Sequence, residues 1–251
     1  MTPAPTPVTD EPITETIITQ AGLDLVTLAN RQRSARGLVA LQADPDLMRI
    51  ARDRARVMAA NDLMSHTEPD GRKVWDRIDA AGLTWFSAGE ILAWNRYPTS
   101  ELSTAAAIFA WMGSPTHHAI MVSTGYNYVG FGMAVSESGR RYYAGVYVKE
   151  PDETGALSQL GKVSRQSVTA SRVRVTLHWS GADTRLQVLT AGLRDFQLHW
   201  RQGNGPWHSW ATTTSIRRSV TWAKGSTHEV RVRARDRVGN WGGWRTVRIK
   251  I

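Results

Sequence analysis

The first regular pattern along the chain is an apolar stripe with helical spacing. Leu25, Leu28 and Ala29 fall on one face of a predicted helix over Leu23–Ala35. Gly37 follows this stretch, in the position where glycine commonly ends a helix. The pattern therefore predicts an amphipathic helix near the start of the chain.

Two further helices are predicted from their start signals. Asp44 is placed to cap one of them, with Pro45 at its first helical position. Thr99 or Ser100 caps the other, which runs to Met112 and is ended by Pro115. The apolar positions expected to be buried are Leu47, Ile50, Ala51, Ala55, Met58, Ala105, Ile108, Phe109 and Met112. Arg49, Arg52, Asp53 and Arg56 are expected on the solvent side of the first of these two helices.

A β-hairpin follows the helices. Its predicted strands are Asn127–Val135 and Arg141–Val148, and the turn between them contains Gly139. Helices followed by an antiparallel hairpin indicate a layered α+β module rather than a parallel βαβ unit.

Short alternating segments dominate the rest of the chain. The predicted strands are Arg172–Trp179, Phe196–Trp200, Glu229–Ala234 and Arg245–Ile251, with turn signals at Gly203–Pro206 and Gly239–Asn240. Strands at short intervals with alternating apolar and polar residues predict an all-β sandwich.

The balance of charge also differs between the predicted α+β module and the predicted β-sandwich. Residues 1–150 carry 14 Lys and Arg against 16 Asp and Glu, whereas 151–251 carry 17 against 6. Seven of the eleven tryptophans also lie beyond residue 170. We therefore expect a Pro/Thr-rich linker over 1–19, an α+β domain over 20–149, a polar linker over 150–170 and a β-sandwich over 171–251.

Cysteine and hydropathy exclude several classes of protein. The chain has no cysteine, so disulfides and thiolate metal sites are impossible. No apolar run approaches the roughly 18 residues of a membrane span, and residues 1–19 lack the features of a signal peptide. Because the opening is typical of a stalk, we expect a targeting segment upstream that was removed or lies outside this sequence.

Three short segments carry the candidate chemistry. His66 precedes an Asp70-Gly71 turn, Glu90 follows Ala88-Gly89, and His117 lies just after Pro115. All three fall outside the predicted helices and strands, where binding residues tend to lie. We expect them to form one site.

These motifs resemble the CAP superfamily (cysteine-rich secretory proteins, antigen 5 and pathogenesis-related proteins) in its cysteine-free bacterial form. The resemblance covers about half the chain, and its matching stretches include SHTEPDGRKVWDRIDAAGL, AGEI, WMGSPTHHAI and VGFGMAV. It implies an α-β-α sandwich with a shallow cleft lined by His66, Glu90 and His117. Ile91 departs from the family's usual Asn and His118 from its usual Arg, and the second family Glu, expected near Ser114, is absent.

Two imidazoles and a carboxylate are suitable ligands for a divalent metal such as zinc, with the fourth position open to water. We therefore predict a cleft that binds a divalent metal or a small ligand, with His66, Glu90 and His117 as the metal ligands. The same three residues are the candidate catalytic groups of an alternative function, a metal-dependent or His/Glu-assisted, peptidase-like hydrolase. Only adjacency nominates Ser65 or Ser114 as a nucleophile, and a purely structural polar cluster also stays open. Whether the protein is an enzyme is undecided, with binding ranked first.

CAP proteins as a class are secreted. They are associated with the binding of sterols or lipids, with the binding of metals and with proteolysis, so the resemblance does not identify the ligand of this chain. The resemblance implies an extracellular or cell-envelope location.

The C-terminal region resembles a fibronectin type III domain. Trp179 would be its core tryptophan, and His228 stands where that family usually has a Tyr. Arg231, Arg233 and Arg235 alternate along one strand, where they either stack on Trp207, Trp210, Trp241 or Trp244 or meet an anionic partner. The partners considered are a cell-surface or cell-wall polymer, a lipid surface and nucleic acid, although no nucleic-acid motif accompanies the stripe.

Overall fold

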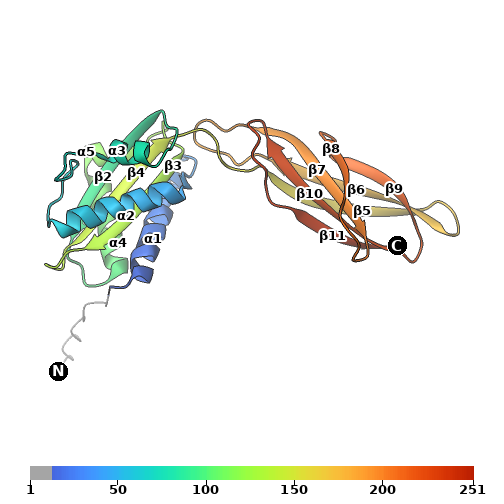
Figure 1. Cartoon of the computed structure of the whole chain (residues 1–251), viewed down its shortest axis with the longest axis horizontal. Helices are drawn as coiled ribbons and strands as arrows, with labels where there is room; N and C mark the ends of the chain where they lie inside the picture. Colours follow the sequence, from blue (N-terminus) through green and yellow to red (C-terminus); the bar gives the residue numbers. More distant parts are fainter. Residues whose placement is uncertain (1–12) are drawn as a thin grey trace, which may run out of the picture. The chain divides into compact units, whose positions relative to one another are not determined.

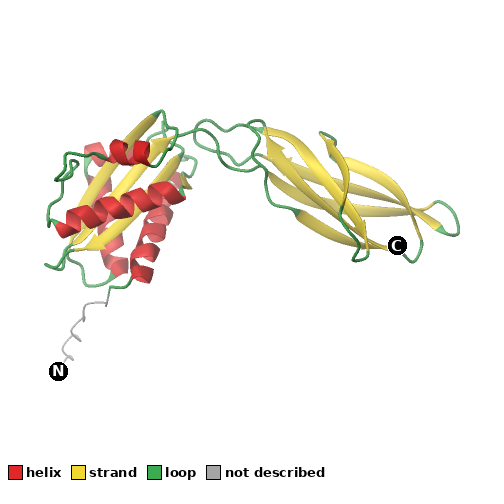
Figure 2. Ribbon diagram, viewed as in Figure 1, coloured by secondary structure: helices red, strands yellow, loops and turns green. Residues whose placement is uncertain are grey.

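The computed structural model describes residues 13–251, which form two compact units (Figure 1). The first unit contains the residues up to Pro151 and Leu186–Leu189, and the second contains Asp152–Arg185 and Thr190–Ile251. Helices and a sheet build the first unit and strands build the second, which confirms the predicted fold class (Figure 2). Within residues 13–251, no helix has both the length and the apolar character needed to cross a membrane.

The first unit has three layers. Its helices are α1 (Glu15–Ser34), α2 (Pro45–Ala60), α3 (Val74–Ala80), α4 (Ser100–Gly113) and α5 (Pro115–Met121). Its strands are β1 (Gln42–Ala43), β2 (Ser87–Asn95), β3 (Tyr128–Val135) and β4 (Arg141–Lys149), in the order β1-β3-β4-β2. β1 pairs with β3 in parallel, and the other pairs are antiparallel.

Successive side chains of a strand point to opposite faces of the sheet, and their contacts show which helices cover each face. On β4, Tyr142, Ala144, Val146 and Val148 pack in the core with α2 and α3. Tyr143 and Tyr147 point the other way and join the core with α1, α4 and the end of α5. Because both faces of the sheet are covered, the central strands are buried on both sides.

Two glycines set the distance between α2 and the sheet. A Cβ on Gly130 would lie 2.1 Å from the Leu47 carbonyl carbon, and one on Gly132 would lie 2.1 Å from the Arg52 backbone nitrogen. Only glycine permits this close approach of helix and strand. The helix that carries Arg54 is thereby held directly against the sheet.

Several helices and strands predicted for this unit are confirmed, whereas the predicted N-terminal linker and part of the predicted core are wrong. The helices at Pro45 and Ser100 and both hairpin strands are confirmed. The linker predicted over 1–19 is wrong beyond Thr14, which caps α1; residues 1–12 lie outside the described residues. Phe109, which is 82% exposed, and Ala105 are exposed rather than buried, because the inner face of α4 is formed by Ala107, Ile108 and Trp111.

Four residues far along the chain complete the first unit. Leu186 is 3% exposed and packs in the α2-side core. Gln187 Oε1 accepts hydrogen bonds from the Val39 N–H (2.9 Å) and from Arg33 Nη2 (3.1 Å). This short segment has no periodic pattern, and the predicted sandwich over 171–251 included it.

The second unit is a sandwich of two antiparallel sheets. One sheet has the order β11-β10-β7-β8 and the other β5-β6-β9. The strands are β5 (Leu157–Ser167), β6 (Arg172–Ala182), β7 (Leu193–Gln202), β8 (His208–Thr213), β9 (Arg217–Ala223), β10 (Thr227–Asp236) and β11 (Arg245–Lys250). The linker predicted over 150–170 is therefore wrong for Leu157–Ser167. β5 is an edge strand with mostly exposed residues, so its composition resembles that of a linker.

Inward-facing residues of both sheets form one core in this unit. Trp179 is 3% exposed and makes an edge contact with Phe196, which confirms it as a core residue. His228 is also buried, and its ring stacks on Trp222 with 4.0 Å between centroids.

Candidate functional site

Glu90 lies within β2, the edge strand of the first sheet, rather than in a loop as expected. Leu92, two residues further along, packs in the core with α2 and α3, so Glu90 points to the same side. Only 3% of the Glu90 side chain is exposed. A buried carboxylate on a strand requires charged or hydrogen-bonding partners.

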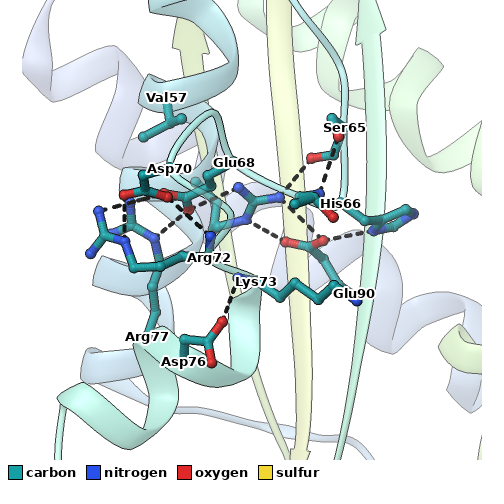
Figure 3. Close-up of polar contacts among 12 residues, drawn as sticks. Val57, Ser65, His66, Glu68, Asp70, Arg72, Lys73, Asp76, Arg77 and Glu90 are labelled. Atoms are coloured by element: carbon teal, nitrogen blue, oxygen red, sulfur yellow. Dashed lines mark hydrogen bonds and ion pairs between the residues drawn. The ribbon is translucent and has the colours of Figure 1, made fainter.

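Two side chains hold the Glu90 carboxylate (Figure 3). Arg54 Nε donates to Oε1 at 2.7 Å, and His66 Nδ1 lies 2.7 Å from Oε2. An ionised carboxylate can only accept hydrogen bonds, so Nδ1 is the protonated nitrogen and Nε2 is left free of Glu90. The His66 side chain is 58% exposed, so this second nitrogen belongs to the solvent-facing part of the site.

Arg54 connects Glu90 to a second buried carboxylate. Its Nη1 donates to Glu68 Oε1 at 2.8 Å. Arg77 donates to both oxygens of Glu68 (Figure 3). Burial alone would raise the pKa of Glu68, but the hydrogen bonds and charges of Arg77 and Arg54 outweigh burial and lower it. Arg54 Nη2 also donates to the Ser65 carbonyl at 2.7 Å, which fixes the loop beside His66.

His117 lies on α5, the helix that begins at Pro115. Burial and the nearby charge of His66 lower the pKa of His117 below its ordinary value. The charge interaction with His66 agrees with the predicted common site, which stays a prediction for His117. Pro115 begins a helix there rather than only ending one.

His118 faces elsewhere. Adjacent residues on a helix point about 100° apart. His118 lines a surface cavity of about 440 Å³ together with residues of α1 and α4, including Leu28 and Phe109. It is therefore a suitable control position for any test of His117.

The donor atoms allow a test of the predicted metal site. Both oxygens of Glu90 already have partners, so binding a metal directly would replace one of these contacts. Among residues 13–251, the group of three His, Asp or Glu side chains whose ligand atoms all lie within 4.8 Å is Asp152, Asp183 and Asp236, in the second unit. The imidazoles of His66 and His117 therefore stay the candidate ligands, and Glu90 contacts His66 through Nδ1, the ring nitrogen that would not bind the metal.

The nominated nucleophiles make local contacts. Ser65 Oγ accepts a hydrogen bond from the Thr67 N–H at 3.1 Å, and Ser114 Oγ lies 3.3 Å from Thr116 Oγ1. In the described structure neither hydroxyl is hydrogen-bonded to His66 or His117. Neither Ser65 nor Ser114 is therefore activated by one of these imidazoles.

Sequence reasoning missed Arg54, Glu68 and Arg77. Position 54 falls on the apolar stripe of α2, between Ala51 and Met58, and the Arg54 side chain is 0% exposed. An arginine at a core position requires buried acidic partners, because an unpaired buried charge is strongly unfavourable. That position was the signal that would have located the charge cluster.

Comparison with known proteins matches a family model to a part of the first unit. The family model "Cysteine-rich secretory protein family", CAP, matches residues 26–148. The uncharacterized protein YkwD of Bacillus subtilis (strain 168) is 27% identical over 114 residues, which make up 45% of this chain and 42% of YkwD. The chain thus spans less than half the length of this relative.

Two solved structures align with separate parts of the chain. An extracellular protein containing a SCP domain from Bacillus anthracis str. Ames aligns at 22% identity and a TM-score of 0.47, over 56% of this chain and 45% of that one. The 6th fibronectin type III domain of human fibronectin type III domain containing protein 3 aligns at 16% identity and a TM-score of 0.26, over 41% of this chain and 86% of that domain. On the match to the family model, residues 26–148 of this chain form a CAP domain.

Proposed function

We propose that the CAP domain binds a divalent metal ion, with zinc the best match, through His66 and His117. The observation that carries the proposal is the 2.7 Å contact between His66 Nδ1 and the buried carboxylate of Glu90. A carboxylate in this position fixes the tautomer and orientation of an imidazole whose other nitrogen binds a metal. Arg54 holds the carboxylate in place from its other side.

The state of His117 supports the same role. A metal ligand must be a neutral imidazole, and the lowered pKa of His117 favours that state at neutral pH. Two imidazoles repel each other when both are protonated, whereas one cation between them removes that repulsion. Such a site leaves further coordination positions to water or to an oxygen of a bound ligand, and the ion would supply Lewis-acid polarisation there.

We further infer that the protein acts outside the cytoplasm, at the cell envelope or beyond it. The description of the matched family as secretory supports this location.

The test is isothermal titration of the full chain with zinc chloride. We expect His66→Ala and His117→Ala each to abolish binding of a stoichiometric ion. Glu90→Gln should weaken binding about 10- to 100-fold, since it acts through His66. His118→Ala is the matched control and should bind as the wild type does. Equal loss in His118→Ala, or no binding by the wild type, would overturn the proposal.

The same variants test the alternative hydrolase function. The pair of Glu90 and His66 also resembles an oriented general base. Turnover of casein by the wild type that is abolished in Glu90→Gln would favour hydrolysis over binding alone.

A further inference from the structure

Guanidinium and indole groups alternate on the outer face of the β11-β10-β7-β8 sheet. The stack, which we call the Arg–Trp ladder, consists of Arg201, Trp207, Arg231, Trp244, Arg233, Trp241 and Arg235 in that order. Each guanidinium carbon lies 4.3 to 4.6 Å from the centroid of its neighbouring ring. Trp210, which the sequence also offered as a partner, instead stacks with Arg218. The predicted stacking is thus confirmed for three of the four tryptophans.

The ends of the ladder are neutralised by carboxylates. Arg201 donates to Glu229 at 2.8 Å, and Arg235 donates to Asp195 at 2.7 Å. Glu229 on β10 and Asp195 on β7 are thus each paired with an arginine at one end of the ladder.

The two central guanidiniums have only neutral side-chain partners. Arg231 lies 3.1 Å from His199 Nδ1, and Arg233 donates to Gln197 Oε1 at 2.9 Å. Within residues 13–251, neither makes an ion pair. Burial, together with the charges of Arg233 and Arg201, lowers the pKa of Arg231. Because Arg231 and Arg233 have no acidic partner among the described residues, the positive charge at the centre of the ladder is not neutralised within the chain.

Neighbouring strands add to this charge. Strand pairing places Arg248 opposite Glu229 and Lys250 opposite Thr227, on the same face as the ladder. The face then carries six cationic side chains against the two carboxylates of Glu229 and Asp195. Residues two apart on a strand are separated by about 6.8 Å, so the four arginines of the ladder extend over about 20 Å.

We propose that this face binds a linear anionic glycan, whose chain lies along β10 and whose charged groups meet Arg231 and Arg233. Guanidinium groups match carboxylate and sulfate geometry through paired hydrogen bonds. The indoles hold these groups at a fixed spacing, so little side-chain entropy is lost on binding.

Geometry favours such a polymer over single-stranded nucleic acid. Base stacking requires an open aromatic face. Trp207, Trp241 and Trp244 each have two guanidinium carbons within 4.6 Å of the ring centroid, so the stacking contacts of these rings are already made by arginines of the chain. Recognition must therefore proceed through the edges of the arginines, which suits charged groups and not bases.

The test is titration of the full chain with polygalacturonic acid at low salt, with uncharged dextran as the control polymer. Arg231→Gln/Arg233→Gln should weaken binding at least tenfold. The matched control is Arg172→Gln/Arg174→Gln, two exposed arginines with the same spacing on β6 of the other sheet. It should change the affinity less than twofold.

A second variant leaves the ladder intact. Gln197→Glu is isosteric and gives Arg233 an internal carboxylate at the position of the present 2.9 Å contact. We expect it to weaken binding at least threefold without loss of thermal stability. Added salt should weaken binding by the wild type more steeply than by this variant.

Three results would overturn the proposal. The first is binding of polygalacturonate no tighter than binding of dextran, and the second is equal loss in both double variants. The third is tighter binding of oligo-dT or of phosphatidylglycerol vesicles that depends on Arg231 and Arg233, which would assign the face to nucleic acid or to a membrane. Because the ladder lies in the second unit, its test can fail or succeed independently of zinc binding at His66 and His117.

Discussion

Arg54 and Glu90 form a buried ion pair that joins α2 to the edge strand β2. Arg54 Nε lies 2.7 Å from Glu90 Oε1, and the two side chains are 0% and 3% exposed. Glu68 and Arg77 extend the pair into a group of two cations and two anions, and the exposed Arg72 lies 3.8 Å from Glu68 at its edge. The balance of positive and negative charge is important for stability, because removing one member leaves an uncompensated charge in the interior.

Arg54→Met should therefore destabilise the CAP domain by about 3 to 5 kcal/mol. Glu68 and Glu90 would both lose a cationic partner at a site closed to solvent. The measurement is urea unfolding followed by the helical signal in circular dichroism, since all helices described lie in the first unit. Arg49→Met, on the exposed side of the same helix, should change stability by less than about 0.5 kcal/mol. Equal effects of the two substitutions would contradict a structural role for the cluster.

The contact between α2 and β3 gives a second prediction. In Gly132→Ala the new methyl group would lie 2.1 Å from the Arg52 backbone nitrogen, so the helix must move. We expect a loss of about 3 kcal/mol or more, at the upper end of overpacking effects. Gly113→Ala, at the end of α4 with nothing within 4 Å, should instead stabilise by about 0.5 kcal/mol. Thermal unfolding of both variants checks the opposite signs.

Local signals in the sequence were sufficient for the elements that frame the site. Asp44 and Pro45 marked the start of α2, and the alternation around Gly139 marked the hairpin. β2 was missed because SAGEILAWN has no clean alternation: Ile91 and Ala93 are buried on one face, and Leu92 is buried on the other, the face that carries Glu90. Tertiary contacts, which a local pattern does not contain, decide that a glutamate can be buried there.

The site shows the same division. Motif spacing correctly brought His66 next to Glu90, now seen at 2.7 Å. It did not indicate that Arg54 occupies the other side of the carboxylate, because that contact joins residues 36 positions apart. The metal-binding and catalytic roles of His66, Glu90 and His117 stay predictions, since they depend on ligands rather than on the chain alone.

A buried histidine in the second unit makes stability depend on pH. Burial lowers the pKa of His228 below the ordinary value near 6.5. Below that ordinary value the unfolded state binds a proton before the folded state does, so stability is complete above about pH 7 and falls as the pH drops. His199, whose pKa is also lowered by burial and by Arg231, contributes in the same direction.

His228→Phe should therefore reduce the loss of stability between about pH 7.5 and pH 5.5, leaving the part due to His199. Urea unfolding followed by tryptophan fluorescence is the measurement, because seven of the eleven tryptophans lie beyond residue 170. A variant that retains the full pH dependence of the wild type would show that His228 does not cause it.

The contact between Glu90 and His66 predicts a single imidazole tautomer, independently of any metal. With an ionised Glu90 at 2.7 Å, the proton of neutral His66 should reside on Nδ1 and the lone pair on Nε2. Nitrogen-15 NMR of the full chain above about pH 8 should then give distinct shifts for a protonated Nδ1 and an unprotonated Nε2. In Glu90→Ala the constraint is lost, and both shifts should move toward the average of the two tautomers. His118→Ala should leave the His66 signals in place, because His118 lines a different surface. An averaged tautomer in the wild type would mean that Glu90 does not hold His66, and the proposed orientation of Nε2 toward a ligand would fail with it.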